Sequence, residues 1–310
     1  MKLNRRVQIA TDLLLAVVLA ALIGTAGCAN LGDGPPTGLL LTAASDTTIR
    51  INWTAPAGSV PDSYVIAFME TGTSTWLDVG SAKDSATQAD HNPLGRTGRY
   101  RVTAVFGSRS YPANQTPTSA PVHTGATTVG ELNSSVYSGF GWNRDSGVGS
   151  IFTMGYASNA DRVDFYITDW SAGFAGPDYY VASPDWGPYE TGGNGFVPAG
   201  SWRPNGFSAL SEGAQSPLPA FDSTRYANNL KLGSDSTLMA MVCTDTFVTV
   251  DTTFAIDTTV TIDTTVTIDT LRTVTRQYAL VKLGSPDIAN GTVQVETWFQ
   301  RIKGLRLIQH

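Results

Sequence analysis

Apolar and polar residues alternate along much of the chain, and turn-forming residues interrupt the alternation about every 8 to 12 positions. The first half shows the pattern at 49–53, 64–68 and 100–104, where aromatic and β-branched residues occupy alternate positions. The turn segment Ala55-Pro56-Ala57-Gly58 separates the first two of these stretches. Such alternation gives each strand one apolar and one polar face, and it predicts a β-sandwich.

Several short motifs in this half resemble those of a fibronectin type III domain. They are Pro35-Pro36 before the first strand, Ile51-Asn52-Trp53, Ser63-Tyr64-Val65-Ile66, and Leu94 six residues before Tyr100-Arg101-Val102-Thr103-Ala104. The resemblance implies a domain over residues 34–124, in which Trp53 fills the core and Tyr100 makes a corner hydrogen bond that pins a crossing loop. In exported bacterial proteins, modules of this family most often act as spacers or as protein- and glycan-binding accessories.

The second half of the chain predicts a separate domain over residues 131–310, behind a linker of small polar residues at 125–130. The stretch 169–216 is rich in Gly and Pro, which predicts an ordered loop without long regular elements. Strand-like segments lie on both sides of it, at 149–156, 162–167, 236–244, 276–283 and 292–301. We expect an all-β sandwich or barrel-like domain, so the predicted fold class of the whole chain is all-β.

An unusual repeat, mostly Asp-Thr-Thr-Val-Thr-Ile, occupies residues 245–270. An Asp recurs every six residues, at Asp245, Asp251, Asp257, Asp263 and Asp269. Because six is a multiple of two, all five carboxylates project from one face of an extended chain, and Val, Ile and Phe project from the other. The repeat predicts a projecting hairpin of two arms of about 13 residues each, since one strand of this length fits no compact domain. Its turn is expected near Thr258-Thr259, with 238–243 and 278–283 paired at the base.

Three other interpretations of the repeat stay open at this point. Hexads also build β-helices, although the Gly or Asn that their corners favour is missing here. Calcium binding would need more converging oxygens than two aspartates across a hairpin supply. The third is a repeat that was expanded by copying and is tolerated outside the core. Its exposed Val and Ile positions still favour strand pairing, so the hairpin is a candidate partner surface or a site of self-association.

The first 28 residues have the pattern of an exported lipoprotein. Three basic residues open the chain, an uncharged apolar run follows, and small residues precede Cys28. An apolar run of about 11 residues is too short to span a bilayer, so it predicts a signal peptide over residues 1–27. The cysteine after Ala-Gly resembles the lipobox of bacterial lipoproteins, which implies lipidation of Cys28 on a tether at 28–33 and a location at the outer membrane or cell surface. An ordinary signal peptide with an incidental cysteine is the alternative.

The charge of the chain excludes nucleic acid as a partner. Without residues 1–27 the chain keeps 17 of its 20 Lys and Arg and 25 of its 26 Asp and Glu, a net charge of −8. This sign is wrong for binding a phosphate backbone, and no basic cluster offsets it. Cys243 is the only cysteine besides Cys28, so no internal disulfide is expected.

Aromatic residues among Gly, Asn, Asp and Pro in the second half are typical of sugar-binding surfaces, where rings stack on pyranoses. The candidate ligand-binding side chains are Trp170, Tyr179, Tyr180, Trp186 and Trp202, and core packing of the same rings is the competing interpretation. Nearby acids that could serve a glycoside hydrolase are Asp164, Asp169, Asp178, Asp185 and Glu190. No serine-hydrolase, zinc-protease or nucleotide-binding motif occurs, so we predict no enzyme, no catalytic residue and no metal site.

Three strand motifs are similar to those of HmuY-like lipoproteins, which bind haem outside the cell. They are Arg162-Val163-Asp164-Phe165-Tyr166-Ile167, Tyr278-Ala279-Leu280-Val281-Lys282-Leu283 and Gly291-Thr292-Val293-Gln294-Val295-Glu296. Axial ligation would have to use Met154, Met239 or Met241, because the second domain offers only the chain-terminal histidine. Met239 and Met241 lie on a predicted strand, where methionine usually fills a core. No cofactor is therefore expected, and haem is the alternative.

These patterns together predict a membrane-anchored, exported lipoprotein that acts as a non-catalytic binding or adhesion module. Its expected partners are the lipid bilayer, through Cys28, and a protein or glycan of the envelope or of the cell exterior. The alternatives are a haem or small-ligand carrier and a glycan-active enzyme.

Overall fold

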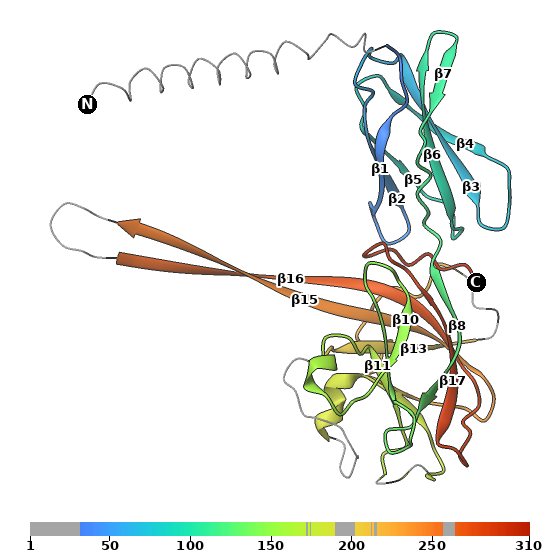
Figure 1. Cartoon of the computed structure of the whole chain (residues 1–310), viewed down its shortest axis with the longest axis vertical. Helices are drawn as coiled ribbons and strands as arrows, with labels where there is room; N and C mark the ends of the chain where they lie inside the picture. The colour runs from blue at the N-terminus through green and yellow to red at the C-terminus, as the bar shows by residue number, and fades with distance from the viewer. Residues whose placement is uncertain are drawn as a thin grey trace, which may run out of the picture.

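The computed structural model describes residues 32–189, 202–256 and 264–310, apart from residues 172, 174, 212, 214 and 215; for 187–189, 247–256 and 264–272 it describes the backbone alone. Within these ranges the chain forms seventeen β-strands and two short 3-10 helices, η1 (Ala157–Asn159) and η2 (Pro184–Tyr189) (Figure 1). No helix in this part of the chain is long and apolar enough to cross a membrane. The predicted all-β class is confirmed.

The N-terminal module is a seven-stranded β-sandwich. One sheet has the strand order β1-β2-β5 and the other has the order β4-β3-β6-β7. The strands are β1 (Thr37–Ala43), β2 (Ile49–Thr54), β3 (Ser63–Glu70), β4 (Leu77–Lys83), β5 (Gln88–His91), β6 (Gly98–Phe106) and β7 (Arg109–Pro112). Two antiparallel sheets over one core are what the fibronectin type III resemblance implies, so the fold of this module is confirmed as fibronectin type III-like.

Alternation along these strands brings aromatic and aliphatic side chains between the two sheets. Trp53 on β2 is 4% exposed, and its ring centroid lies 5.1 Å from that of Tyr64 on β3. Burying a large apolar side chain of this kind stabilises a fold by roughly 1.5–3 kcal/mol. Trp53 therefore fills the core as predicted.

Tyr100 on β6 is fully buried, and its hydroxyl lies 2.9 Å from Nδ1 of His91 at the end of β5. The expected corner hydrogen bond would have pinned a crossing loop, so this bond to a strand side chain differs from the family pattern. Leu94, which belongs to the motif that carried the resemblance, is 78% exposed and has a φ of 54°. The side chain of His91 thus replaces the loop as the partner of Tyr100.

The C-terminal domain packs two five-stranded sheets face to face, with the strand orders β10-β9-β11-β12-β14 and β13-β15-β16-β17-β8. The strands of the first sheet are β9 (Gly139–Trp142), β10 (Gly149–Phe152), β11 (Phe165–Thr168), β12 (Tyr180–Ala182) and β14 (Asn229–Lys231). Those of the second are β8 (Val122–Gly130), β13 (Asn205–Leu210), β15 (Thr237–Ile256), β16 (Thr264–Leu283) and β17 (Thr292–Phe299). Buried rings such as Phe140, Trp142 and Phe299 fill the space between the sheets.

Both sheets of this domain are also covered on their outer faces. Leu218 and Tyr226, from the loop after β13, belong to one cluster with Ala240 and Val242 of β15. Trp202 joins a separate cluster on the outer face of the other sheet. A strand covered on both sides has no polar face, which explains why 238–243 is apolar or small at every position.

Two expectations about this domain are wrong. The predicted linker 125–130 is the second half of β8, which pairs with β17 at the edge of the sheet. The predicted loop 169–216 contains β12 and β13, and β13 pairs with β15 from Asn205 to Leu210. The prediction interpreted Gly206 as a loop residue. In the structure Gly206 is part of a strand, and glycine is needed there because a Cβ would lie only 2.9 Å from the Tyr226 side chain.

The last ten residues cross back from the C-terminal domain to the N-terminal module. Leu305 and Leu307 are fully buried and complete the core that contains Trp53. Arg306 reaches Asp46, with a backbone hydrogen bond of 2.8 Å and an ion pair of 2.9 Å. The expected boundary of the second domain at 131–310 therefore needs correction, because residues 301–310 pack with both modules.

Candidate functional site: a projecting hairpin and its ionic base

The most prominent feature of the surface is a two-stranded ribbon that leaves the C-terminal domain. β15 and β16 pair without a bulge from Thr237–Leu283 to Ile256–Thr264. Their neighbours end much earlier, since β13 pairs with β15 only up to Cys243 and β17 pairs with β16 only from Ala279. The remaining lengths, 244–256 and 264–276, form what we call the arm, and Figure 1 shows it projecting away from the body. The predicted hairpin and its base are confirmed.

The register of the arm sets the phase of the Asp repeat. Asp251 lies opposite Asp269 in the pairing, and Phe254 lies opposite Val266. Opposed positions of an antiparallel pair belong to the same face of the ribbon, so the acidic and apolar positions stay on separate faces across both strands. Asp257, Asp263 and the expected turn at 258–259 lie outside the described residues.

The outer edges of the arm can be identified from hydrogen bonds at its base. The Thr244 N–H donates to Asn205 Oδ1 at 2.9 Å, and the Arg276 carbonyl accepts from the Gly304 N–H at 2.7 Å. Both groups point out of the β15–β16 pair. Backbone groups of even-numbered arm residues therefore face outward, because the direction alternates along an antiparallel strand. Beyond the base, no other described strand of this chain pairs with them.

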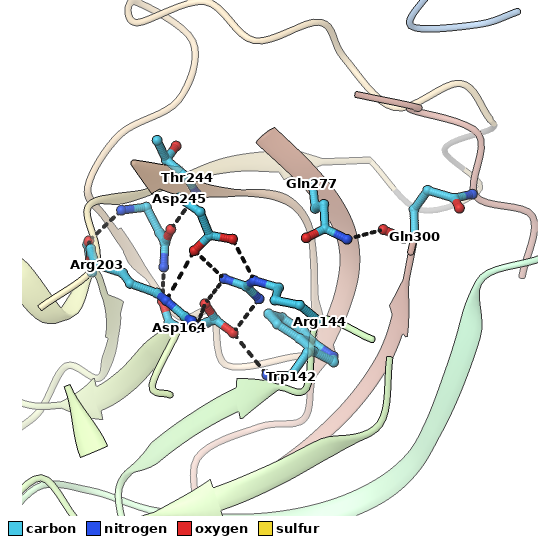
Figure 2. A network of polar contacts seen from close by, with 10 residues as sticks. Trp142, Arg144, Asp164, Arg203, Thr244, Asp245, Gln277 and Gln300 are labelled. Carbon is cyan, nitrogen blue, oxygen red and sulfur yellow. Dashed lines mark hydrogen bonds and ion pairs between the residues drawn. The ribbon is translucent and has the colours of Figure 1, made fainter. Parts of the chain in front are cut away.

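A cluster of two arginines and two aspartates, the ionic base, holds the arm where it leaves the domain (Figure 2). Arg144 follows β9, Asp164 precedes β11, Arg203 precedes β13, and Asp245 belongs to β15. Arg144 lies 2.6 Å from Asp164 and 2.9 Å from Asp245. Arg203 lies 3.2 Å from each of the same two carboxylates. Each charge thus has two partners of opposite sign, and the four segments are tied together.

Polar contacts complete the ionic base. The Trp142 N–H donates to Asp164 Oδ2 at 2.9 Å. Asn205 donates from Nδ2 to the Asp164 carbonyl at 2.7 Å and accepts from the Thr244 N–H. The amide of Gln277 donates to the Arg301 carbonyl at 2.9 Å, which joins β16 to the C-terminal segment. The base of the arm is therefore fixed to both sheets and to the tail.

Burial makes this cluster sensitive to the loss of any member. The Asp164 side chain is fully buried, and the other three side chains are 13–18% exposed. Burial by itself lowers the pKa of Arg144, but the charges of Asp164 and its neighbours outweigh burial, so the net direction is upward. Removing one partner of a buried ion pair leaves an uncompensated charge. Asp245, the first aspartate of the repeat, is accordingly a structural residue.

The structure separates the five aromatic candidates. Trp170 and Tyr180 lie together half-buried, with ring centroids 5.7 Å apart, and Trp186 is half-buried on η2. Tyr179 is buried in the core between the sheets, and Trp202 is buried in the cluster on the outer face. Trp170 has a φ of 60°, an unusual backbone for a bulky residue. Their role in ligand binding stays a prediction.

The candidate acids are used for different structural tasks. Asp169 accepts from the N–H groups of Ser171 and Gly176 at 2.9 and 2.8 Å, which shapes the loop around Trp170. Asp178 forms an exposed ion pair with Lys231 at 2.7 Å. Asp185 accepts a hydrogen bond from the Ser183 hydroxyl, and burial raises the pKa of its carboxyl. Asp164 belongs to the ionic base, and Glu190 lies outside the described residues.

The sulfur-containing candidates are all buried where they are described. Met239 and Met241 are fully buried between the two sheets, and Met154 packs on the outer face of one of them. Cys243 is a free, buried thiol, and burial followed by the charge of Asp164 raises its pKa. Cys28, the predicted lipidation site, lies outside the described residues.

Comparisons with known proteins add little beyond the fold. No protein-family model matches the chain, and no curated protein matches it. A fibronectin type III domain of human collagen XX is 18% identical over 28% of this chain and 88% of that chain, with a TM-score of 0.24. The FN5 domain of Drosophila Lar is 17% identical over 28% of this chain and 96% of that chain, with a TM-score of 0.23. The arm and its ionic base have to be interpreted from their own chemistry.

Proposed function

We propose that this protein is an exported, lipid-anchored binding or adhesion protein whose contact element is the arm. Lipidation of Cys28 would hold the chain at the membrane. The two β-modules would act as a spacer that carries the arm away from the bilayer. A protein ligand would bind along an outer edge of the arm.

The observation that carries this proposal is the free strand edge of the arm. Outward-facing N–H and C=O groups recur at every second residue beyond the last positions of β13 and β17. A row of unpaired backbone groups is a template on which an extended segment of another protein can add as a further strand. The ionic base supports the same role, because it fixes the direction in which the arm leaves the domain.

The composition of the arm suits a contact surface that is soluble when free. Residues 246–271 of the hairpin contain four Asp and no Lys or Arg, and the arginines of the arm, Arg272 and Arg276, lie toward its base. Charges on one face keep copies of the arm apart in solution, while the β-branched residues favour the extended conformation that strand addition needs. The apolar face provides the contact area.

Glycan is a second ligand class, and the pair Trp170–Tyr180 favours it. Their rings lie together, half-buried, where Trp170 of the loop that Asp169 shapes meets Tyr180 at the start of β12. Aromatic rings that stay partly accessible in this way can stack on sugar rings. This site and the arm are independent of each other.

The test compares the full-length protein with two arm variants in a screen against envelope proteins, extracellular proteins and a glycan array. In the first variant, Asn-Gly replaces residues 248–272 and joins Phe247 to Thr273, a pair whose backbone groups face each other. In the second, Thr252→Pro removes one outward N–H and keeps the arm. We expect both to lose protein ligands, while Lys83→Glu, an exposed change on β4, binds as wild type. Unchanged protein binding in both arm variants would refute the proposal, and Trp170→Ala tests glycan binding separately.

A further inference from the structure

A groove of about 550 Å³ runs along the junction of the two modules. One wall is the edge strand β1, from Leu40 to Ala43, and the opposite wall is the segment Thr116-Pro117-Thr118. Arg301, Ile302 and Lys303 of the C-terminal segment close one end. The Gln115 side chain marks the other end, because its Oε1 accepts from the Leu39 N–H at 3.0 Å.

The β1 wall presents unpaired backbone groups to this groove. β1 is the edge strand of its sheet, with β2 as its only neighbouring strand among the described residues. The Ala44 N–H donates to the Thr48 carbonyl at 2.9 Å, which fixes the alternation of the ladder. Thr42 and Leu40 therefore bond toward β2, and the N–H and C=O groups of Leu41 and Ala43 face away from it. The groove can accept one more strand beside β1.

The opposite wall, Thr116-Pro117-Thr118, is hydrogen-bonded to β6 on the side away from the groove. The Pro117 carbonyl accepts from the Tyr100 N–H at 3.0 Å, and Thr118 forms a bridge with Arg99, so this segment continues the edge of the second sheet. The groove is therefore the open seam between the two sheets of the N-terminal module. An extended chain is the form of ligand that can bond to the outward-facing backbone groups of β1.

We propose that this groove binds an edge of the arm from a second copy of the protein as an added strand beside β1. Arg301 at the end of the groove complements the outer part of the hairpin, because residues 246–271 contain four Asp and no basic residue, and the arginines of the arm, Arg272 and Arg276, lie toward its base. Arg301 is exposed and makes no ion pair among the described contacts. The arm also has the unpaired, outward-facing groups that β1 needs as partners.

The arm of the same copy cannot fill the groove, because the ionic base directs it away from the body (Figure 1). The Gly304 N–H bonds to the Arg276 carbonyl, so the groove lies beside the base of the arm. An arm that leaves this base in the outward direction cannot fold back into a groove beside its own base. Arm and groove are different surfaces, which makes the contact heterologous. Each copy can give its arm to one neighbour and accept an arm from another.

The test uses a fluorescein-labelled peptide with the sequence of residues 261–271, titrated into the full-length protein in detergent. Ala43→Pro removes one outward N–H without removing a bond to β2, so peptide affinity should fall about tenfold. Arg301→Glu should weaken binding by a similar factor, and added salt should shrink this difference. Lys83→Glu is the matched control and should bind the peptide as wild type. Thermal melts check that each variant folds.

Co-capture of two differently tagged full-length populations tests the same contact between whole molecules. It should fail with the shortened arm and with Ala43→Pro. A peptide that does not bind, or that binds both groove variants as tightly as wild type, would overturn the inference.

The inference rests on the proposed role of the arm as a binding element, and the two can fail separately. If the arm variants lose external protein ligands and the peptide does not bind the groove, the proposed function is supported and the inference is refuted. If the peptide binds the groove and the arm variants keep their external ligands, the inference is supported and the proposed function is refuted.

Discussion

The side chain of Gln309 accepts two hydrogen bonds from Thr97, one from the backbone N–H at 3.1 Å and one from the hydroxyl at 3.2 Å. These residues are 212 positions apart and belong to different modules. Because Leu305 and Leu307 enter the N-terminal core just before this contact, the C-terminal segment acts as a structural part of the first module. The first module is therefore incomplete until the whole chain has been made.

Leu307→Ala should destabilise the N-terminal module by about 2–5 kcal/mol, since it removes a fully buried leucine from that core. Chemical denaturation followed by hydrogen–deuterium exchange in strands β2, β3 and β6 measures the change. A fragment of residues 34–124 should be less stable than the same module in the full chain. Equal stability of fragment and full chain would show that the tail only rests on the surface.

Asp164→Asn should cost about 3–5 kcal/mol of stability in the C-terminal domain, because Arg144 and Arg203 lose a buried partner. The matched control is Asp178→Asn, which breaks an exposed pair with Lys231 and should cost about 1 kcal/mol or less. Urea denaturation measures the free energy of unfolding of both variants, and the two losses relative to wild type are compared. Similar losses in the two would mean that the ionic base contributes no more than a surface pair.

Replacing residues 248–272 with Asn-Gly should leave the melting temperature of the C-terminal domain nearly unchanged. The ionic base and both flanking strands stay intact in this variant, because β13 and β17 pair only below Thr244 and Arg276. Differential scanning calorimetry measures the transition. A domain that fails to fold would assign a core role to the arm and revive the β-helix interpretation of the repeat.

The stability of the N-terminal module should fall as the pH drops below about 6.5, the ordinary value for histidine. Burial, and then the charge of Arg96, lower the pKa of His91 in the folded state. The unfolded chain therefore binds a proton more readily than the folded chain as the pH falls, and protonation favours unfolding. Thermal melts between pH 7.5 and about 5 should show this slope in wild type and a smaller one in His91→Gln.

Tyr100→Phe, which removes the hydroxyl that contacts His91, should cost about 1 kcal/mol.

Cys28→Ser should move the protein from the detergent-soluble membrane fraction to the soluble exported fraction. The lipobox resemblance implies that the lipid is attached to the Cys28 thiol, which serine lacks. Fractionation followed by immunoblotting measures the distribution. A membrane fraction of unchanged size would contradict the lipid anchor.

Local patterns predicted the strands of the first module and the hairpin well. The alternation at Ile49, Ile51 and Trp53 depends only on neighbours in sequence, and those side chains are buried as expected. The even period of the repeat likewise predicted an arm whose pairing the register confirms. Both predictions needed no knowledge of distant residues.

The ionic base and the tail could not be predicted, because each depends on contacts between distant segments. Arg144 and Asp245 are 101 positions apart, and nothing near either residue signals the other. Leu305 and Leu307 alternate as in a strand, but sequence gives no sign of which core they enter. Gly206 was misinterpreted for a related reason. Glycine is required at this position by the packing of Tyr226, a contact that the local sequence does not show.

The even repeat also makes the reach of this protein easy to alter in a gene. Duplicating one hexad adds three residue pairs to the hairpin, a gain of about 10 Å, and moves the turn by three positions. Because six is even, each residue keeps its face of the ribbon, and Asp positions stay opposite Asp positions as Asp251 and Asp269 are now. The pairs from Thr237–Leu283 to Thr244–Arg276 keep their partners. Slippage during replication of a short repeat could therefore lengthen or shorten the hairpin in steps that never disturb the domain beneath it.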